Sequence, residues 1–174
     1  MIRSAFYLVL PVAGTVSDEI LAVQRRFDPR LAAAWPPHAT LAGSSGMGPI
    51  PGDVPVTQLR DVLEPIAHET APIELPFGAP MRFMQSDVVV LPLDPHGPLR
   101  ALHERVKLSG LPYAPPRFAF TPHVTLSFYP ELDRERLRDL LSFRLAVPAR
   151  FEQLHVYRSF ENRTSRFVMN LPLG

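Results

Sequence analysis

Pro37-His38-Ala39-Thr40-Leu41 and Pro122-His123-Val124-Thr125-Leu126 are two copies of one pattern, Pro-His-x-Thr-Leu, in a chain that has only six histidines. The two histidines are separated by 123 − 38 = 85 residues. With so few histidines a chance recurrence of this pattern would be unusual, so we interpret the pair as the mark of a duplicated unit. Two copies predict two half-sites.

The spacing within each copy is that of a β-strand with one functional face. Successive side chains of a strand point to opposite faces, so the His and Thr of each copy share one face and the aliphatic residues point to the other. The proline before each histidine cannot donate a ladder hydrogen bond and belongs at a strand start. The pattern therefore predicts strands over residues 38–42 and 123–129, each offering an imidazole and a hydroxyl to a groove.

Composition sets the limits of the fold. The chain has 174 residues, of which 46% are hydrophobic, and this is enough for one globular domain with a proper core. The absence of Cys excludes disulfides, thiol nucleophiles and Cys-ligated zinc. A short apolar run over residues 5–10 ends at Pro11, which favours a first strand over an export signal. We expect a cytoplasmic protein with no membrane partner.

Charge is unevenly distributed between the two halves of the chain. Residues 1–87 carry 6 Arg and 9 acids, 6 − 9 = −3, whereas residues 88–174 carry 11 Arg, one Lys and 8 acids, 12 − 8 = +4. The C-terminal half is therefore where we expect an anionic ligand. The excess is too small for a broad nucleic-acid platform.

Strands and helices interleave in the rest of the chain. Apolar runs predict further strands at 3–12, 73–77, 81–84, 88–93, 151–160 and 166–171. Helical periodicity predicts helices at 18–27, 56–69, 97–108 and 133–141. We expect Ser17 to cap the first helix and Pro65 to kink or shorten the second. These spacings favour paired β-α-β units and hairpins over a parallel doubly wound sheet.

The Gly- and Ser-rich segment 43–55 has no apolar periodicity. Its glycines superficially suggest a phosphate cradle, but no Lys-Ser or Lys-Thr follows and the next helix starts several residues later. We interpret the segment as a flexible connection beside the site.

Two imidazoles that face one groove can divide the work of acid–base catalysis. The unperturbed imidazole pKa, about 6.5, allows proton transfer in either direction near neutrality. In a displacement at phosphorus the nucleophile and the leaving oxygen lie on opposite sides, so a base on one side and an acid on the other are required. A Thr hydroxyl beside each His suits a non-bridging phosphoryl oxygen.

The paired His-x-Thr motifs resemble those of the two-histidine (2H) phosphoesterase superfamily, specifically its 2′-5′ RNA ligase and cyclic phosphodiesterase branch. The likeness extends to an N-terminal strand ending in Leu10-Pro11 and to a C-terminal strand with Leu154, Val156 and Ser159. It implies an α+β, bilobal fold in which two antiparallel sheets are related by a pseudo-twofold axis, with helices outside and a central cleft. Residues 1–174 would form one domain of two interleaved lobes, each contributing one His-x-Thr strand.

The same resemblance implies metal-independent, cofactor-free chemistry on 2′,3′-cyclic phosphates. His38 and His123 would be base and acid, in an order that the sequence leaves open, and Thr40 and Thr125 would bind the phosphate. Attack by water gives a 2′-phosphate, and attack by an RNA 5′-hydroxyl gives a 2′-5′ linkage without ATP. The implied partners are RNA ends or nucleotides bearing the cyclic phosphate. An RNA end, a tRNA half, a mononucleotide and an ADP-ribose derivative all remain open, and no protein partner is implied.

Arg117, Phe120, Tyr7 and Arg158 are further candidates for substrate binding. Arg117 lies near the second motif, where some relatives carry basic residues, and Phe118 or Phe120 beside it would be either a base-stacking platform or part of the core. Tyr7 and Arg158 are candidates if their strand faces meet the cleft. Many relatives have an acid where this chain has Arg158.

Two other interpretations compete with catalysis. A metal site would need a carboxylate near the two histidines, and no His-x-x-x-His or His-Glu-x-x-His spacing is present. A non-catalytic module for RNA ends or nucleotides would keep its affinity without hydrolysis. The sequence also predicts that His68, His103 and His155 are core residues.

Overall fold

The computed structural model describes residues 4–83, 86–129 and 132–174 as a mixture of strands and helices. The strands are β1 (Ser4–Pro11), β2 (His38–Ala42), β3 (Ile50–Pro51), β4 (Ile73–Leu75), β5 (Met81–Arg82), β6 (Val89–Pro92), β7 (His123–Ser127), β8 (Ala149–Phe151), β9 (Gln153–Phe160) and β10 (Ser165–Pro172). The helices are α1 (Thr15–Phe27), α2 (Pro29–Ala32), α3 (Val56–His68), α4 (Gly97–Lys107) and α5 (Arg134–Ser142).

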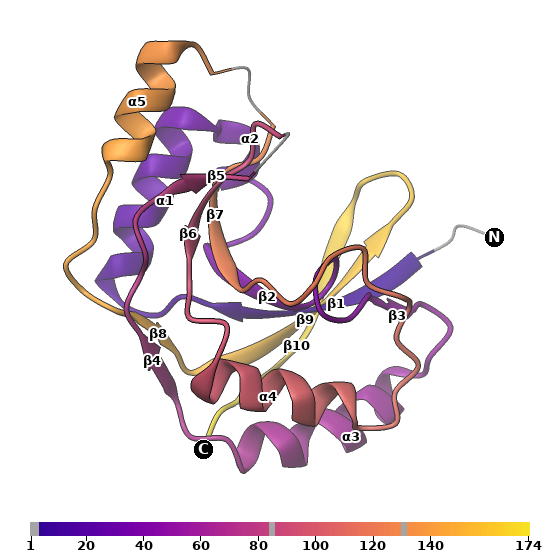
Figure 1. The fold of residues 1–174 in the computed structure, drawn as a ribbon. Coiled ribbons are helices and arrows are strands. Elements are labelled where there is room, and N and C mark those ends of the chain that lie inside the picture. Colours follow the sequence, from indigo (N-terminus) through magenta and orange to yellow (C-terminus); the bar gives the residue numbers. More distant parts are fainter. Residues whose placement is uncertain (1–3, 84–85, 130–131) are drawn as a thin grey trace.

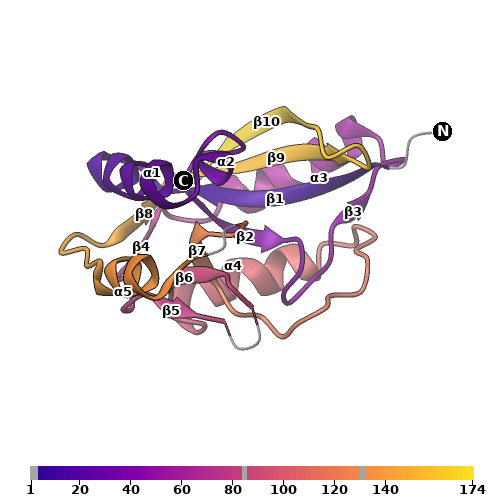
Figure 2. The same cartoon turned by 90° about the horizontal axis from the view of Figure 1, so that it is seen from above.

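One antiparallel sheet carries both motif strands at its centre. Its order is β10-β9-β1-β2-β7-β6-β5, with β3 added to β1, and Figure 2 shows the strands in this order from top to bottom. β4 and β8 form a separate antiparallel pair. We call β10, β9, β1 and β2 the first half-sheet, and β7, β6 and β5 the second. The α+β class with antiparallel sheets is confirmed, and the two half-sheets meet where β2 lies against β7.

The junction between the half-sheets lies at equivalent residues of the duplicated motif. β2 and β7 are joined through the antiparallel pair Ala39–Val124, and these positions are separated by 124 − 39 = 85 residues. Antiparallel pairing of equivalent residues is what a twofold axis between two strands produces. The order strand, helix, strand also occurs on both sides, as β1-α1-β2 and as β6-α4-β7.

The helices cover the outer sides of the two half-sheets. Figure 1 shows α3 and α4 along one side of the first half-sheet, and α1 and α5 beside the second. α1 follows β1 in the chain yet packs on β7, and α3 contacts both β10 and α4. Each motif strand is therefore supported by elements from both halves of the chain. No helix in the described ranges has the length and apolar character needed to cross a membrane.

The alternation predicted for the motif strands is confirmed. Ala39, Leu41, Val124 and Leu126 are at most 1% exposed and belong to the core. The histidines and threonines of both motifs are only half-buried, because they lie on the opposite face of the same strands.

Several element boundaries differ from the sequence prediction. α1 begins at Thr15, before the predicted Asp18, because Gly14 at φ +76° turns the chain into the helix without a side-chain cap. α3 continues through Pro65 to His68. The predicted strand 151–160 is divided at Glu152, since β8 pairs with β4 whereas β9 pairs with β1. Predicted strand 81–84 is seen as β5, and its residue 84 lies outside the described residues.

The segment after the first motif is tied to another loop by backbone hydrogen bonds. The carbonyl oxygen of Ser44 accepts hydrogen bonds from the backbone N–H groups of Arg117 (2.9 Å) and Phe118 (3.1 Å). The N–H of Gly46 donates to Phe118 O at 2.9 Å, and that of Gly48 donates to Ala114 O at 2.9 Å. These bonds join the chain after the first motif to the chain before the second.

Candidate active site

The four motif side chains share one face of the sheet at the junction of β2 and β7. Counting outward from the Ala39–Val124 pair sets His38 across from Thr125, and Thr40 across from His123. Cross-strand neighbours of this kind have Cβ atoms about 5 Å apart. Two imidazoles and two hydroxyls therefore converge on one small area, and each imidazole faces a hydroxyl from the other motif.

The two imidazoles are oriented by equivalent contacts, each with the backbone carbonyl oxygen two residues earlier. His38 Nδ1 lies 2.7 Å from Pro36 O, and His123 Nδ1 lies 2.6 Å from Thr121 O. A carbonyl oxygen can only accept, so Nδ1 carries the proton in each neutral ring and Nε2 holds a lone pair. Both rings therefore present a proton-accepting nitrogen from equivalent positions.

Burial keeps both rings neutral near pH 7. It lowers the pKa of His38 from 6.5 to about 4, against the opposing effect of the Pro36 hydrogen bond. A protonated His123 or His155 nearby lowers the His38 pKa further. Burial also lowers the pKa of His123 below 6.5. Because the charge of His123 acts on His38, protonation of one ring disfavours protonation of the other.

Aromatic side chains fill the space beside His38. The Trp35 ring lies 5.4 Å from the His38 ring and stacks on Tyr157, with centroids 4.7 Å apart and an interplanar angle of 23°. Tyr7 meets Trp35 edge-on at 6.0 Å. The Trp35 indole N–H donates to Ser165 Oγ at 2.7 Å. We call Tyr7, Trp35 and Tyr157 the His38 aromatic cluster.

An open cavity lies beside His123 instead. It has a volume of about 680 Å³ and includes His123 and Thr125 in its wall, and we call it the His123 pocket. Its other apolar lining residues are Met81, Phe83, Val88, Phe118 and Phe128. Its other hydroxyl groups come from Ser44, Ser45, Ser86 and Thr121. Within the described ranges, no Arg or Lys is among these lining residues, although the charge distribution had favoured the C-terminal half for an anion.

This duplicated arrangement agrees with a comparison against protein families. A family model described as the 2′-5′ RNA ligase superfamily matches residues 13–163. The chain belongs to this superfamily. A protein of Geobacillus thermodenitrificans described as a "putative phosphoesterase" is 31% identical over 123 residues, which are 68% of this chain and 66% of that protein.

Solved structures share the superfamily fold over nearly the whole chain. Escherichia coli LigT complexed with phosphate has a TM-score of 0.57 and 16% identity, covering 99% of each chain. LigT complexed with 3′-AMP has a TM-score of 0.58 and 15% identity, covering 98% of each chain. A crystal structure described as a phosphoesterase gives a TM-score of 0.54. At these identities the likeness concerns the fold alone.

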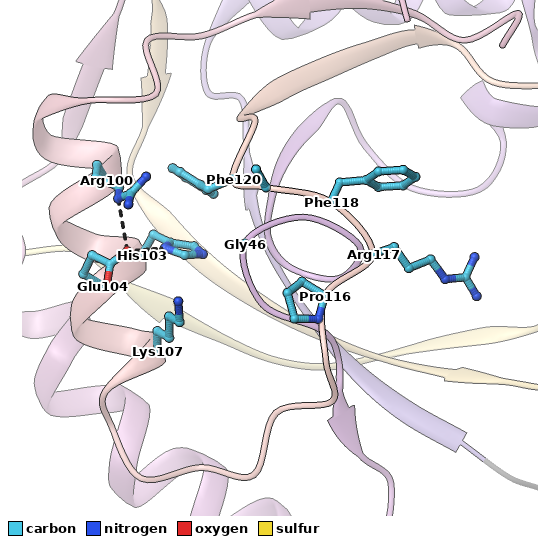
Figure 3. Close-up of a pocket in the computed structure, with 10 residues that line it drawn as sticks. Gly46, Arg100, His103, Glu104, Lys107, Pro116, Arg117, Phe118 and Phe120 are labelled. Atoms are coloured by element: carbon cyan, nitrogen blue, oxygen red, sulfur yellow. Dashed lines mark hydrogen bonds and ion pairs between the residues drawn. The ribbon is translucent and has the colours of Figure 1, made fainter. Parts of the chain in front are cut away.

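The basic and aromatic candidates before the second motif lie around a different cavity. Arg117 and Phe120 line a cavity of about 400 Å³ that also includes α4 residues. Phe120 stacks on the buried His103, with centroids 3.9 Å apart, so it serves as packing. Figure 3 shows the side chains of Arg117 and Phe118 directed away from α4. Of these candidates only Phe118 also lines the His123 pocket.

Strand alternation places the last two candidates, Tyr7 and Arg158, on opposite faces of the sheet. Tyr7 pairs with Tyr157 across β1 and β9 and lies on the face of the His38 aromatic cluster. Arg158 is on the other face, where Nε donates to Ser4 Oγ at 3.0 Å and Nη2 donates to Gly52 O at 2.8 Å. The structure brings Tyr7 towards the site and leaves Arg158 in a structural network.

The second motif is supported by two buried polar residues, Gln24 in α1 and Asp28 at the C-terminal end of that helix. Neither was a candidate from the sequence. Gln24 Nε2 donates to Thr125 O at 2.8 Å. Asp28 is 3% exposed, and its carboxylate accepts from the N–H groups of Leu31 (3.0 Å), Phe128 (2.7 Å) and Tyr129 (2.9 Å). The only signal was Asp28 before Pro29, which is typical of a helix N-cap.

The other histidines predicted to be core residues differ in burial. His103 is 1% exposed, as predicted, whereas His155 is half-buried and His68 is exposed, so the core prediction is wrong for His68. Within the described ranges, no three His, Asp or Glu side chains are grouped as a metal site requires.

Proposed function

We propose that the protein is an RNA 2′,3′-cyclic phosphodiesterase that opens cyclic phosphate ends to 2′-phosphates by acid–base catalysis from His38 and His123. An RNA 5′-hydroxyl can replace the attacking water in this scheme, and the product is then a 2′-5′ linkage formed without ATP. His38 and His123 exchange protons with the reacting oxygens, while Thr40 and Thr125 bind the phosphoryl oxygens.

The observation that carries the proposal is the matched orientation of the two imidazoles. Each ring has Nδ1 at a backbone carbonyl oxygen, 2.7 Å for His38 and 2.6 Å for His123, which leaves Nε2 for proton transfer. Neighbouring strands carry the two rings on one face. In-line displacement at phosphorus needs one group beside the nucleophile and one beside the leaving oxygen, and this pair meets that need.

A bound phosphate supplies the protonation state that the free site lacks. Both rings are neutral near pH 7 because burial lowers their pKa values. A phosphodiester anion between the rings favours the charged form of an adjacent imidazole and so raises its pKa. One ring can then hold a proton for the leaving oxygen while the other, still neutral, takes the proton of the water.

Ligands of structurally similar proteins are compatible with this proposal. Escherichia coli LigT, whose fold the chain shares, has been crystallised with phosphate and with 3′-AMP. Phosphate and a nucleoside 3′-monophosphate both carry the phosphoryl group that a 2′,3′-cyclic nucleotide presents. The family description, 2′-5′ RNA ligase superfamily, supports an RNA end as the substrate.

The decisive experiment is product analysis with purified protein in EDTA and without ATP. The substrates are an oligonucleotide ending in a 2′,3′-cyclic phosphate and the four 2′,3′-cyclic mononucleotides, with and without a 5′-hydroxyl acceptor strand. We expect 2′-phosphates as hydrolysis products, and their formation should be roughly 10²–10⁴-fold slower with His38→Ala or His123→Ala. Retained affinity for 2′-phosphorylated ends without turnover, unchanged in His38→Ala, would identify a binding module instead. Loss of activity in EDTA would contradict metal-independent chemistry.

A further inference from the structure

A second cavity lies next to the His123 pocket and shares a wall with it. This cavity has a volume of about 400 Å³ and lies between α4 and the segment before β7, and we call it the α4 cavity (Figure 3). Phe118 is 65% exposed and belongs to the lining of both cavities. Ser44 lines the His123 pocket, and Gly46, two residues later, lines the α4 cavity. A linear ligand that starts at the histidine pair can therefore continue into the α4 cavity by passing Phe118.

The two cavities differ in charge. The lining of the α4 cavity includes three cations, Arg100, Lys107 and Arg117, and one acid, Glu104, so its formal charge with neutral His is 3 − 1 = +2. Among the described residues that line the His123 pocket there is no Arg, Lys, Asp or Glu. All three cations belong to the C-terminal half of the chain, where the sequence predicts an anionic ligand. The α4 cavity thus supplies the positive charge that the His123 pocket lacks.

The positive charge of the α4 cavity is only partly neutralised within the protein. Arg100 Nε lies 3.1 Å from Glu104 Oε1, and this contact uses one nitrogen of the guanidinium group. No acid in the described parts of the chain forms an ion pair with Lys107 or Arg117. Both of these side chains are exposed, and Lys107 is the only lysine of the chain. Two cations of the cavity are therefore available to a ligand that enters from solvent.

The cations of the α4 cavity are spread over a distance. Arg100, Glu104 and Lys107 follow one another at four and three residues, so they lie on one face of α4. The seven residues from Arg100 to Lys107 correspond to a rise of about 10 Å along the helix. Arg117 precedes Phe118, and Figure 3 shows both side chains directed away from α4. Charges arranged in this way suit a ligand with several anionic groups in a row rather than a single phosphate ion.

The floor of the α4 cavity is formed before a ligand binds. His103 is 1% exposed and stacks on Phe120, with ring centroids 3.9 Å apart. Gly46 lies against the same imidazole, and a Cβ at this position would overlap it. The backbone N–H of Arg117 donates to Ser44 O at 2.9 Å. The backbone around the cavity is therefore fixed, and only the cationic side chains have to move when a ligand binds.

We propose, on the basis of the function proposed above, that the α4 cavity binds the RNA strand upstream of the reacting end, with its backbone phosphates at Arg100, Lys107 and Arg117. An RNA strand carries one phosphate per nucleotide, which matches cations spread over a distance. Contacts to phosphates carry no sequence information, so the strand can have any sequence. The favoured substrate is therefore an RNA end several nucleotides long, whereas a 2′,3′-cyclic mononucleotide occupies the histidine pair alone.

The first test compares a strand with a single nucleotide. The substrates are a short RNA oligonucleotide ending in a 2′,3′-cyclic phosphate and 2′,3′-cyclic AMP, both in EDTA. Lys107→Gln removes a cation that only the strand reaches, so KM for the strand should rise roughly fivefold while KM for the mononucleotide stays the same. Lys107→Arg should restore the KM for the strand. The slope of log KM against log salt should fall by about 0.7 in Lys107→Gln, the share of one phosphate contact in a single strand.

The matched control is Arg105→Gln. Arg105 lies on the same helix, two residues before Lys107, but its guanidinium pairs with Glu69 at the end of α3, at 2.7 Å. This variant loses the same charge as Lys107→Gln, and we expect no change in KM for either substrate. An effect on the strand equal to that of Lys107→Gln would show that net charge alone matters. That result, or an equal effect of Lys107→Gln on the mononucleotide, would overturn the proposal.

The second test measures binding without turnover. Fluorescence anisotropy gives the affinity for an RNA strand ending in a 2′-phosphate and, by competition, for adenosine 2′-monophosphate and for ATP. We expect the strand to bind roughly tenfold more tightly than either nucleotide, and the double variant Lys107→Gln/Arg117→Gln to lose this advantage. An advantage that survives in the double variant, or tighter binding of ATP that depends on Lys107, would overturn the proposal. The expected binding in a protein that hydrolyses no cyclic phosphate would refute the proposed function and still support the α4 site.

Discussion

The two His-x-Thr motifs are alike in their backbone and different in their surroundings. Both histidines bind the carbonyl oxygen two residues earlier, at 2.7 and 2.6 Å, and both motifs bury the same aliphatic positions. Beyond these positions they diverge, because Trp35 and Tyr7 enclose the first motif while Phe118 and Phe128 border a pocket at the second. In the reaction proposed above, the duplicated geometry serves proton transfer, and the divergent neighbours make the surroundings of the two imidazoles unequal.

The largest expected effect tests what the motifs share. His38→Ala and His123→Ala should each reduce kcat for cyclic nucleotides roughly 10²–10⁴-fold, because each removes one proton-transfer group. Circular dichroism should show an unchanged fold for both variants. If one variant kept nearly full activity, the catalytic equivalence of the two motifs would be refuted.

The second prediction concerns the support that only the second motif has. Asp28→Ala should lower the free energy of unfolding by on the order of 2–4 kcal/mol, because three partly buried N–H groups lose the buried carboxylate that accepts from them. Denaturant titration measures this change. The control is Asp94→Ala: Asp94 is exposed and, among the described residues, accepts only the His96 N–H at 2.9 Å, so about 1 kcal/mol or less is expected. Equal losses would mean that the Asp28 contacts add no particular stability.

The third prediction concerns pH. The catalytic base must be unprotonated and the acid protonated, so kcat/KM rises with pH through the lower of the two histidine pKa values and falls through the higher. Burial sets the His38 pKa at about 4 and the His123 pKa below 6.5. We therefore expect a bell with its maximum below pH 6.5 and a fall that approaches tenfold per pH unit above it. A profile that is flat from pH 6.5 to 8.5 would contradict these shifts.

A smaller effect is expected for the hydroxyls that both motifs supply. Thr40→Ala and Thr125→Ala should each reduce kcat roughly tenfold, since a neutral donor to a phosphoryl oxygen is lost while both imidazoles remain. Thr→Ser at either position keeps the hydroxyl and should recover most of the rate. If the serine variants were as slow as the alanine variants, packing of the threonine methyl group would be the cause.

The smallest effect is expected for Gly43, which lies beside the first motif where the second motif has Phe128. Gly43→Ala should reduce kcat several-fold, because the new Cβ would meet Thr40 Cγ2 at 2.7 Å and must displace that side chain. A change in KM alone for Gly43→Ala would contradict an effect through Thr40 and would show that Gly43 borders the bound substrate.

The motif strands could be predicted closely because their signal is local. Alternation fixes which face His38 and Thr40 share, and β2 has the predicted bounds, residues 38–42. The start of α1 could not be predicted from capping residues, since Gly14 enters the helix by its backbone conformation. The faces of Tyr7 and Arg158 depend on the β1–β9 register, which no local pattern records. The pocket depends on contacts between residues far apart, such as Asp28 with Phe128.

The narrow seam between the half-sheets has a mechanical consequence. A long ladder of hydrogen bonds stiffens neighbouring strands against relative rotation, whereas β2 and β7 are joined through the single pair Ala39–Val124. A rotation of the half-sheets about that pair would alter the gap between the imidazoles and would leave the ladders within each half-sheet intact. Gln24 and Asp28 oppose such a rotation. Gln24 binds α1 to Thr125 in β7, and Asp28 at the C-terminal end of α1 binds Phe128 just after β7. In the proposed reaction, the distance between the two imidazoles therefore depends on these contacts as well as on the motif strands.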